Sequence, residues 1–145
     1  MAGAIKAIAG RARPYVSADT NPRDLALGRG FNKGNYKSFP SGHATAAFSA
    51  AAAVVAETHE WWPHSTWYIA PVMYGGAAAV GLSRMYDDQH WASDVLMGAA
   101  IGTFAGVKTV RFNHTRAGNR IDQILLGARV VPTGNGAALS WSGTF

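Results

Sequence analysis

The 145-residue sequence contains no cysteine. Disulfide frameworks and thiolate metal sites are therefore excluded, whereas the redox compartment stays undetermined. Charged residues are also scarce, at 14% against the usual quarter, while hydrophobic residues make up 48%. This composition argues against disorder and favours helices that are buried in protein or lipid. The length suits one domain with a core of its own.

The net charge of +5 is unevenly distributed. Lys and Arg outnumber Asp and Glu by seven to two in residues 1–40 and by four to one in residues 111–145, whereas residues 41–110 carry two against five. The basic first segment suits an anionic partner, and a solvated basic surface is the alternative. Because the basic residues are dispersed and match no nucleic-acid-binding motif, we expect no nucleic-acid partner.

The first ten residues, MAGAIKAIAG, lack the charged segment and long apolar run of a signal peptide. They predict the end of a helix, and we expect this chain to be the C-terminal part of a longer protein. Pro14 ends the helix, predicted over Ala2–Arg13, because the residue before proline is disfavoured in the α region. Residues 15–39 follow as one long polar loop, a length that indicates a binding site or a lid.

Three apolar segments predict the main helices. They comprise residues 43–58, 67–82 and 91–110. The third carries Gly98, Gly102 and Gly106, a four-residue spacing that lets a neighbouring backbone approach closely. In the tail, a period of two around Leu139 and Trp141, with Gly-Asn-Gly as the turn, predicts a short β-hairpin.

These segments raise the question of a membrane, because a spanning helix needs about 20 apolar residues. The third segment is long enough, and the first two fall slightly short. Aromatic residues cluster between the first two like an interfacial belt, namely Trp61, Trp62, Trp67 and Tyr68. We therefore expect membrane embedding, with a soluble helical bundle as the alternative.

A polar cluster, Pro40-Ser41-Gly42-His43, stands at the start of the first apolar segment. Ser41 can cap the helix by accepting a hydrogen bond from a free backbone N–H. A cap explains neither His43 nor Gly42, since glycine in a helix costs about 1 kcal/mol relative to alanine. A ligand explains both, because a helix N-terminus attracts anions, glycine allows close approach and histidine transfers protons.

A second polar cluster, SRMYDDQHWASD, separates the second and third apolar segments. His90 and Asp94 are four residues apart, the spacing at which Asp94 accepts the ring N–H of His90 on a helix. A carboxylate in that position fixes the tautomer and leaves the other ring nitrogen free as a base or nucleophile. Arg84 supplies a planar fork suited to a tetrahedral oxyanion. The alternative for the His–Asp pair is a plain helix surface.

A third cluster consists of Lys6 and Arg13. The two residues are separated by two helical turns, which places both cations on one helix face about 10 Å apart. Their long side chains can converge on one anion, although this spacing is common. Together the clusters offer cations, anion-facing N–H groups and two histidines, one with a carboxylate partner. This inventory is typical of phosphoryl transfer, in which positioning and electrostatic stabilisation do most of the work.

The clusters carry a resemblance to a known family. In order they read Lys6-x6-Arg13-Pro14, Pro40-Ser41-Gly42-His43 and Ser83-Arg84-x5-His90-x3-Asp94. This resembles the three-part signature of the type 2 phosphatidic acid phosphatase (PAP2) family, whose superfamily includes bacterial acid phosphatases and vanadium haloperoxidases. Every signature position is filled, and the segment HWASDVLMGAAIG is most similar to bacterial membrane lipid-phosphate phosphatases.

The resemblance implies an all-α helical bundle of the PAP2 and haloperoxidase type over residues 1–120, followed by a tail over residues 121–145. It also implies a metal-independent phosphatase that acts on a phosphomonoester or diphosphate, of a lipid in particular, through a phosphohistidine. Membrane members commonly have six spanning helices with the Lys–Arg motif after the third, so it implies preceding helices as well.

The roles that the resemblance implies fall on the motif positions. The phosphate-binding residues would be Lys6, Arg13, Ser41, Gly42 and Arg84. His90 would attack phosphorus, Asp94 would orient His90, and His43 would protonate the leaving oxygen and then activate water. No metal or cofactor is expected, and vanadate is expected to inhibit as a mimic of the pentacoordinate state.

The resemblance places the protein in the bacterial inner membrane with the site facing the periplasm, and a soluble periplasmic protein is the alternative. Phosphatidate, phosphatidylglycerol phosphate, undecaprenyl diphosphate and lipid A phosphate all present the same head group. Three competing interpretations are a vanadium-dependent haloperoxidase with His90 as the vanadate ligand, a non-catalytic helical membrane subunit, and a metal site at Asp87, Asp88 and His90.

Overall fold

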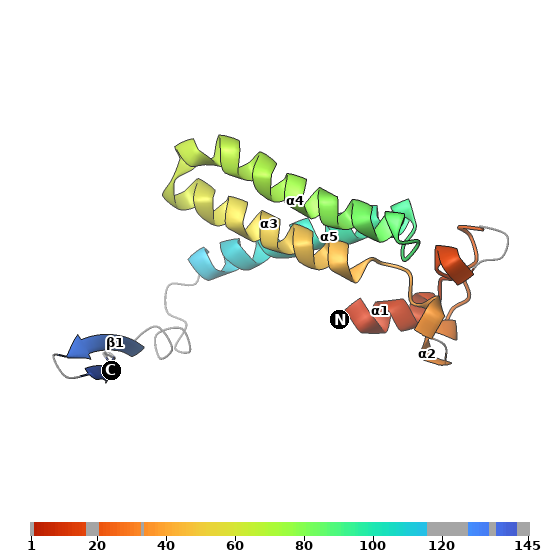
Figure 1. Ribbon diagram of the computed structural model, residues 1–145, viewed down its shortest axis with the longest axis horizontal. Helices are drawn as coiled ribbons and strands as arrows, with labels where there is room; N and C mark the ends of the chain where they lie inside the picture. The colour runs from red at the N-terminus through yellow and green to blue at the C-terminus, as the bar shows by residue number, and fades with distance from the viewer. Residues whose placement is uncertain (1, 17–20, 33, 116–127, 134–135, 142–145) are drawn as a thin grey trace. The chain divides into compact units, whose positions relative to one another are not determined.

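The computed structural model describes residues 2–16, 21–32, 34–115, 128–133 and 136–141. Its α-helices are α1 (Ala2–Ala9), α2 (Arg29–Asn32), α3 (Gly42–Trp61), α4 (Thr66–Tyr86) and α5 (Ala92–Thr115) (Figure 1). The short 3₁₀ helices are η1 (Pro14–Val16), η2 (Gly34–Tyr36) and η3 (Pro63–Ser65). The strands are β1 (Ala128–Thr133) and β2 (Gly136–Trp141).

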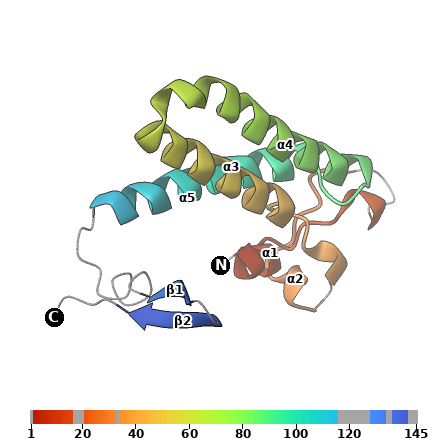
Figure 2. The same ribbon diagram turned by 60° about the vertical axis from the view of Figure 1, so that its left-hand side comes forward.

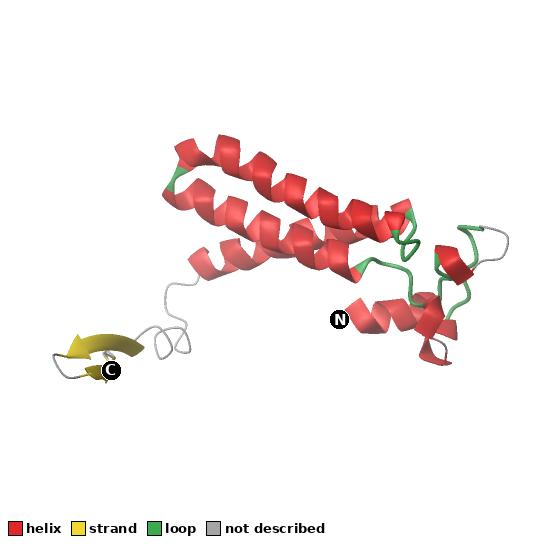
Figure 3. Ribbon diagram, in the orientation of Figure 1, coloured by secondary structure: helices red, strands yellow, loops and turns green. Residues whose placement is uncertain are grey.

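Helices dominate the described residues, which confirms the predicted all-α class (Figure 3). The chain divides into two compact units, Met1–Val110 and Arg111–Phe145. In the second unit β1 and β2 pair antiparallel, with Ala128 opposite Trp141 and Thr133 opposite Gly136. The predicted hairpin is therefore present, and the first two residues of its expected turn, Gly134 and Asn135, lie outside the described residues.

The first unit is built on three long helices that lie side by side, α3, α4 and α5 (Figures 1 and 2). The residues that they bury are mostly small, including Ala44, Ala51, Ala52 and Ala77. Large apolar side chains on α4 and α5 are exposed instead, among them Leu82, Leu96 and Phe104. The bundle is thus held by close backbone packing, and apolar surface is left on its outside.

Glycine accounts for the contact between α3 and α5. A Cβ built on each of three glycines of α5 would lie 2.6, 2.3 and 2.4 Å from a carbonyl oxygen of the N-cap or the first half of α3, in the pairs Gly98–Ser41, Gly102–Thr45 and Gly106–Ser49. Real Cβ atoms do not approach backbone oxygens so closely. The predicted close approach of a neighbouring backbone along this stripe is confirmed.

Helix α5 is long and apolar enough to cross a membrane by length and composition. Most of its apolar stretch is exposed. It is the one helix among the described residues that meets both conditions, in agreement with the expectation that the third apolar segment has a sufficient length.

Helix α1 ends at Ala9, so the prediction that it continues to Arg13 is wrong. Gly10 leaves the helix with φ +55°, and a Cβ there would lie 2.0 Å from the carbonyl oxygen of Ala26. Only glycine suits this left-handed backbone against a crossing chain. Lys6 and Arg13 therefore do not share a helix face, although both remain close to the site described below.

The prediction of one unbroken loop over residues 15–39 is also wrong. The segment contains most of η1, all of α2 and η2, and an isolated β-bridge between Arg11 and Leu25. Gly30 of α2 contacts α1 directly, because a Cβ there would lie 2.8 Å from the Cα of Ala7. Hydrogen bonds from the Arg29 guanidinium to the Gly10 carbonyl, at 3.1 and 3.2 Å, close the end of α1. The loop is folded onto α1.

Candidate active site

The starts of α3 and α5 meet, and the predicted site residues gather around them. The backbone N–H of Ser41 donates to the carbonyl of Asp94 at 3.0 Å, and the Ser41 carbonyl lies against Gly98. The Ser41 hydroxyl caps α3 by accepting from the Ala44 N–H at 3.4 Å, as the sequence predicted. Ser41 is completely buried, so the cap also fixes the first turn of α3.

Lys6 reaches the first residue of α3 from α1. A Cβ on Gly42 would lie 3.2 Å from the Lys6 Nζ, so the absence of a side chain at Gly42 leaves room for the ammonium group. Burial lowers the pKa of Lys6, and the nearby Arg13 lowers it further, while Asp94 acts in the opposite direction. Lys6 and Arg13 therefore lie near one another even though α1 ends before Arg13.

His43 stands exposed at the start of α3, within reach of four positively charged or basic groups. Its pKa is lowered, first by partial desolvation and then by Arg84, His90, Lys6 and Arg13 in that order. Separate segments of the sequence thus supply the groups that act on one imidazole. An anion that enters next to His43 is attracted by all of these cations and by the N-terminus of α3.

His90 and Asp94 are close, but the expected hydrogen bond between them is not formed. The distance from His90 Nδ1 to Asp94 Oδ2 is 3.8 Å, which is too long for a hydrogen bond. His90 lies before the first residue of α5, so the i, i+4 geometry of a helix does not apply to the pair. His90 is 4% exposed, and its Nδ1 is buried without a hydrogen-bond partner in the described part of the chain.

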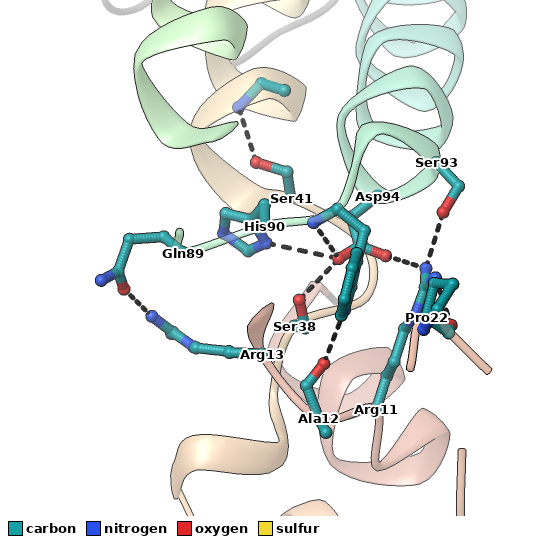
Figure 4. A network of polar contacts seen from close by, with 12 residues as sticks. Arg11, Ala12, Arg13, Pro22, Ser38, Ser41, Gln89, His90, Ser93 and Asp94 are labelled. Atoms are coloured by element: carbon teal, nitrogen blue, oxygen red, sulfur yellow. Dashed lines mark hydrogen bonds and ion pairs between the residues drawn. The ribbon is translucent and has the colours of Figure 1, made fainter. Parts of the chain in front are cut away.

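The Asp94 carboxylate has other partners (Figure 4). Its Oδ2 accepts hydrogen bonds from the Ser38 hydroxyl at 2.5 Å and from the Trp91 backbone N–H at 3.0 Å. The Trp91 contact is one half of a capping box, because Asp94 is the third residue of α5. Its Oδ1 accepts from the Arg11 guanidinium in a buried ion pair. Sequence reasoning missed Arg11 and Ser38, although Arg11 lies two residues before Arg13 and Ser38 lies two residues before Pro40.

The two arginines expected to bind phosphate have partners from the connection between α4 and α5. Arg84 forms an ion pair with Asp87 at 2.8 Å, and one guanidinium nitrogen of Arg13 donates to the Gln89 side chain. The Arg13 Nε is buried without a hydrogen-bond partner among the described residues. In this structure the side-chain oxygens of Asp87 and Gln89 thus accept contacts from the two arginines that are predicted to bind phosphate.

The described residues contain no group of three or more His, Asp or Glu side chains placed to hold a metal ion. The chemistry that they offer instead consists of an anion site lined by cations, an exposed histidine whose pKa is lowered, and a buried histidine beside a carboxylate. Such a set can bind a phosphate, attack it and transfer a proton to or from it.

Comparisons with known proteins agree with this set of residues. The chain is 42% identical over 69 residues to the lipid A 1-phosphatase of Porphyromonas gingivalis, a stretch that covers 48% of this chain and 15% of the relative. No solved structure gives a significant match. The model of the PAP2 superfamily matches residues 1–117, most of the chain. The chain therefore belongs to the PAP2 superfamily.

Proposed function

We propose that this chain carries the active site of a metal-independent phosphatase that hydrolyses a phosphomonoester or diphosphate of a lipid through a phosphohistidine. The observation that carries the proposal is that motif residues from distant parts of the sequence meet at the starts of α3 and α5. There the Lys6 Nζ lies beside Gly42, and His90 lies 3.8 Å from Asp94. Lys6, Arg84 and Arg13 also lower the pKa of the neighbouring His43. Family membership supports the reaction class. The name of the relative, a lipid A 1-phosphatase, supports a lipid phosphate as the substrate.

In the first step, Lys6, Arg13 and Arg84 bind the phosphate oxygens, and the N-terminus of α3 at Ser41 and Gly42 adds N–H donors. The phosphate replaces Asp87 and Gln89 as the partner of the two arginines. A ring nitrogen of His90 then forms a bond to phosphorus, while the bond from phosphorus to the lipid oxygen breaks.

The leaving oxygen needs a proton, and His43 donates it because it stands exposed beside the anion site. In the second step, neutral His43 takes a proton from water, the water oxygen bonds to phosphorus, and the nitrogen–phosphorus bond breaks. Inorganic phosphate leaves and both histidines return to their starting states. The cations stabilise the negative charge on the phosphoryl oxygens in both steps, so the cycle needs no metal.

The exposed apolar face of α5 supports a location in a membrane, where a lipid substrate is found. Within the proposal, the protein lies in a bacterial inner membrane and the site faces the periplasm.

The test is the release of phosphate from a short-chain phosphatidate, and from lipid A in a second arm, in detergent with EDTA. We expect release by the parent chain, none by His90→Ala, and release by the control His64→Ala, which alters an exposed histidine of η3 outside the site. The parent is also expected to form an acid-labile phosphoenzyme and to be inhibited competitively by vanadate. Release by His90→Ala at the parent rate refutes the role of His90, and loss of activity in EDTA refutes metal independence.

A further inference from the structure

Arg11 occupies one of the unspecified positions between Lys6 and Arg13 in the first signature motif, and its buried guanidinium contacts the Asp94 carboxylate (Figure 4). It is 6% exposed, and its side chain has a partner on every side. One terminal nitrogen donates to Asp94 and, at 2.8 Å, to the Ser93 hydroxyl. The Nε and the other terminal nitrogen donate to the Pro22 carbonyl at 3.0 and 2.6 Å. The guanidinium also lies 5.8 Å from the ring centre of Trp91.

The carboxylate that Arg11 contacts is itself completely buried. A buried charge is tolerated only when it is paired and hydrogen-bonded, and Arg11 is the oppositely charged partner of Asp94 inside the protein. Arg11 also contributes to orientation. It binds Oδ1, and this leaves Oδ2 as the oxygen that faces His90. A rotation of the carboxylate away from His90 would break the bond to Arg11.

We propose that Arg11 is a positioning residue that sets both the direction and the effective charge of the carboxylate facing the proposed nucleophile, His90. The role rests on the proposed function. When His90 carries phosphate its ring is cationic, and Asp94 Oδ2 can then approach Nδ1 from the present 3.8 Å. Arg11 holds the carboxylate ready for this approach and limits the negative charge that acts on the free imidazole.

Arg11 does not belong to the group that surrounds the anion site. The cations that act on His43 are Arg84, Lys6 and Arg13, and Arg11 is not one of them. Its guanidinium is directed at Asp94 and at the loop carbonyl of Pro22. A change at Arg11 is therefore expected to lower kcat and to leave the affinity for phosphate esters and vanadate unchanged.

The experiment compares the parent with Arg11→Met, Arg11→Lys and the control Arg29→Met. Arg29 anchors the same folded loop through Asp24 at 2.7 Å and stacks on Tyr36 at 3.9 Å, and it makes no contact with Asp94. We expect Arg11→Met to lower kcat about 10- to 100-fold, by analogy with the loss found when the carboxylate or carbonyl partner that orients a metal-ligating histidine is removed. KM and the vanadate inhibition constant should stay within about twofold of the parent values, because a residue that acts only in the chemical step lowers kcat without changing the binding of substrate.

The Arg11→Lys variant is a control for misfolding in Arg11→Met, because lysine keeps the positive charge and loses only the planar guanidinium geometry. We expect it to restore part of kcat. Arg29→Met is expected to lower the melting temperature without a selective loss of kcat. Equal kinetic effects of Arg11→Met and Arg29→Met, or a parallel rise of KM, would reduce Arg11 to a loop anchor and overturn the proposal.

A second measurement does not depend on turnover. The ring nitrogens of His90 in a ¹⁵N-histidine-labelled chain are assigned by the loss of their signals in His90→Gln. These signals should move in Arg11→Met and Arg11→Lys and stay in place in Arg29→Met. If they are the same in all variants, the inference is wrong, whatever the activity. If the parent releases no phosphate, the proposed function fails, and the His90 signals alone decide whether Arg11 controls the carboxylate.

Discussion

Replacing Gly102 by alanine is expected to force α3 and α5 apart. The new Cβ would lie 2.3 Å from the Thr45 carbonyl oxygen and 3.0 Å from the Ser49 backbone nitrogen. Ordinary contacts are about 3.5–4.0 Å, so the helices must separate by roughly 1 Å. Backbone atoms cannot rotate away as a side chain can, and this places the cost at the upper end of the overpacking range, about 3 kcal/mol.

Alanine is also a better helix former than glycine by about 1 kcal/mol, so the net loss of unfolding free energy is about 2 kcal/mol. At roughly 3 °C per kcal/mol for a chain of this length, the melting temperature should fall by about 6 °C. The control is Gly76→Ala in α4, where no heavy atom of the described residues lies within 4 Å of the new Cβ. This variant should gain helix propensity and melt slightly higher than the parent.

Thermal unfolding of the three chains in the same detergent, followed by circular dichroism at the helix band, measures the difference. The two alanine variants should shift in opposite directions. If both melt above the parent, the α3–α5 contact is not close enough to exclude a methyl group, and the reasoning from the glycine stripe is refuted.

Two further perturbations test the charges of the site. Arg84→Lys replaces a planar guanidinium by a point charge and should lower kcat/KM about 100-fold in the phosphate-release assay. The control Arg23→Lys, on the exposed loop, should change kcat/KM little. Equal kcat/KM values for the two variants would show that Arg84 does not bind the phosphate. The pKa of His43 is lowered from its ordinary value of 6.5 in the folded chain, so the unfolded chain binds more protons between these two pKa values. The free energy of unfolding should therefore fall as the pH drops from 6.5 through the folded-state pKa of His43, and His43→Asn should remove this part of the slope; identical slopes of melting temperature against pH would contradict the lowered pKa.

The sequence was sufficient to predict those features that depend on residues close to one another along the chain. The cap at Ser41 follows from residue type and position, and the stripe of Gly98 and Gly102 follows from spacing. The prediction from sequence failed where a contact with a segment distant along the chain determines the local structure. The end of α1 depends on the chain that crosses Gly10, and the partner of Asp94 is set by how the segment with Arg11 folds onto the start of α5.

The difference between short-range and long-range determinants also explains why the motif residues lie close together although two of the geometric arguments for their proximity were wrong. Lys6 and Arg13 were expected to converge through a shared helix, and they converge through a turn instead. His90 and Asp94 were expected to be hydrogen-bonded on one helix, yet His90 precedes α5 and lies 3.8 Å from the carboxylate. A sequence motif predicts which residues lie close together in the fold, whereas their hydrogen bonds and distances depend on the path of the chain between them.

The contact between α3 and α5 has a consequence for how this protein can vary. Its close approaches join glycine positions to main-chain carbonyl oxygens, beginning at Ser41 beside the site. The distance between the two helices is therefore set by the main chain and is independent of which apolar side chains cover the outside. Exposed residues such as Leu96 and Phe104 can therefore be exchanged without changing the distance between α3 and α5. The outer surface of the bundle can thus vary in sequence while the arrangement of the motif residues at the starts of α3 and α5 is kept.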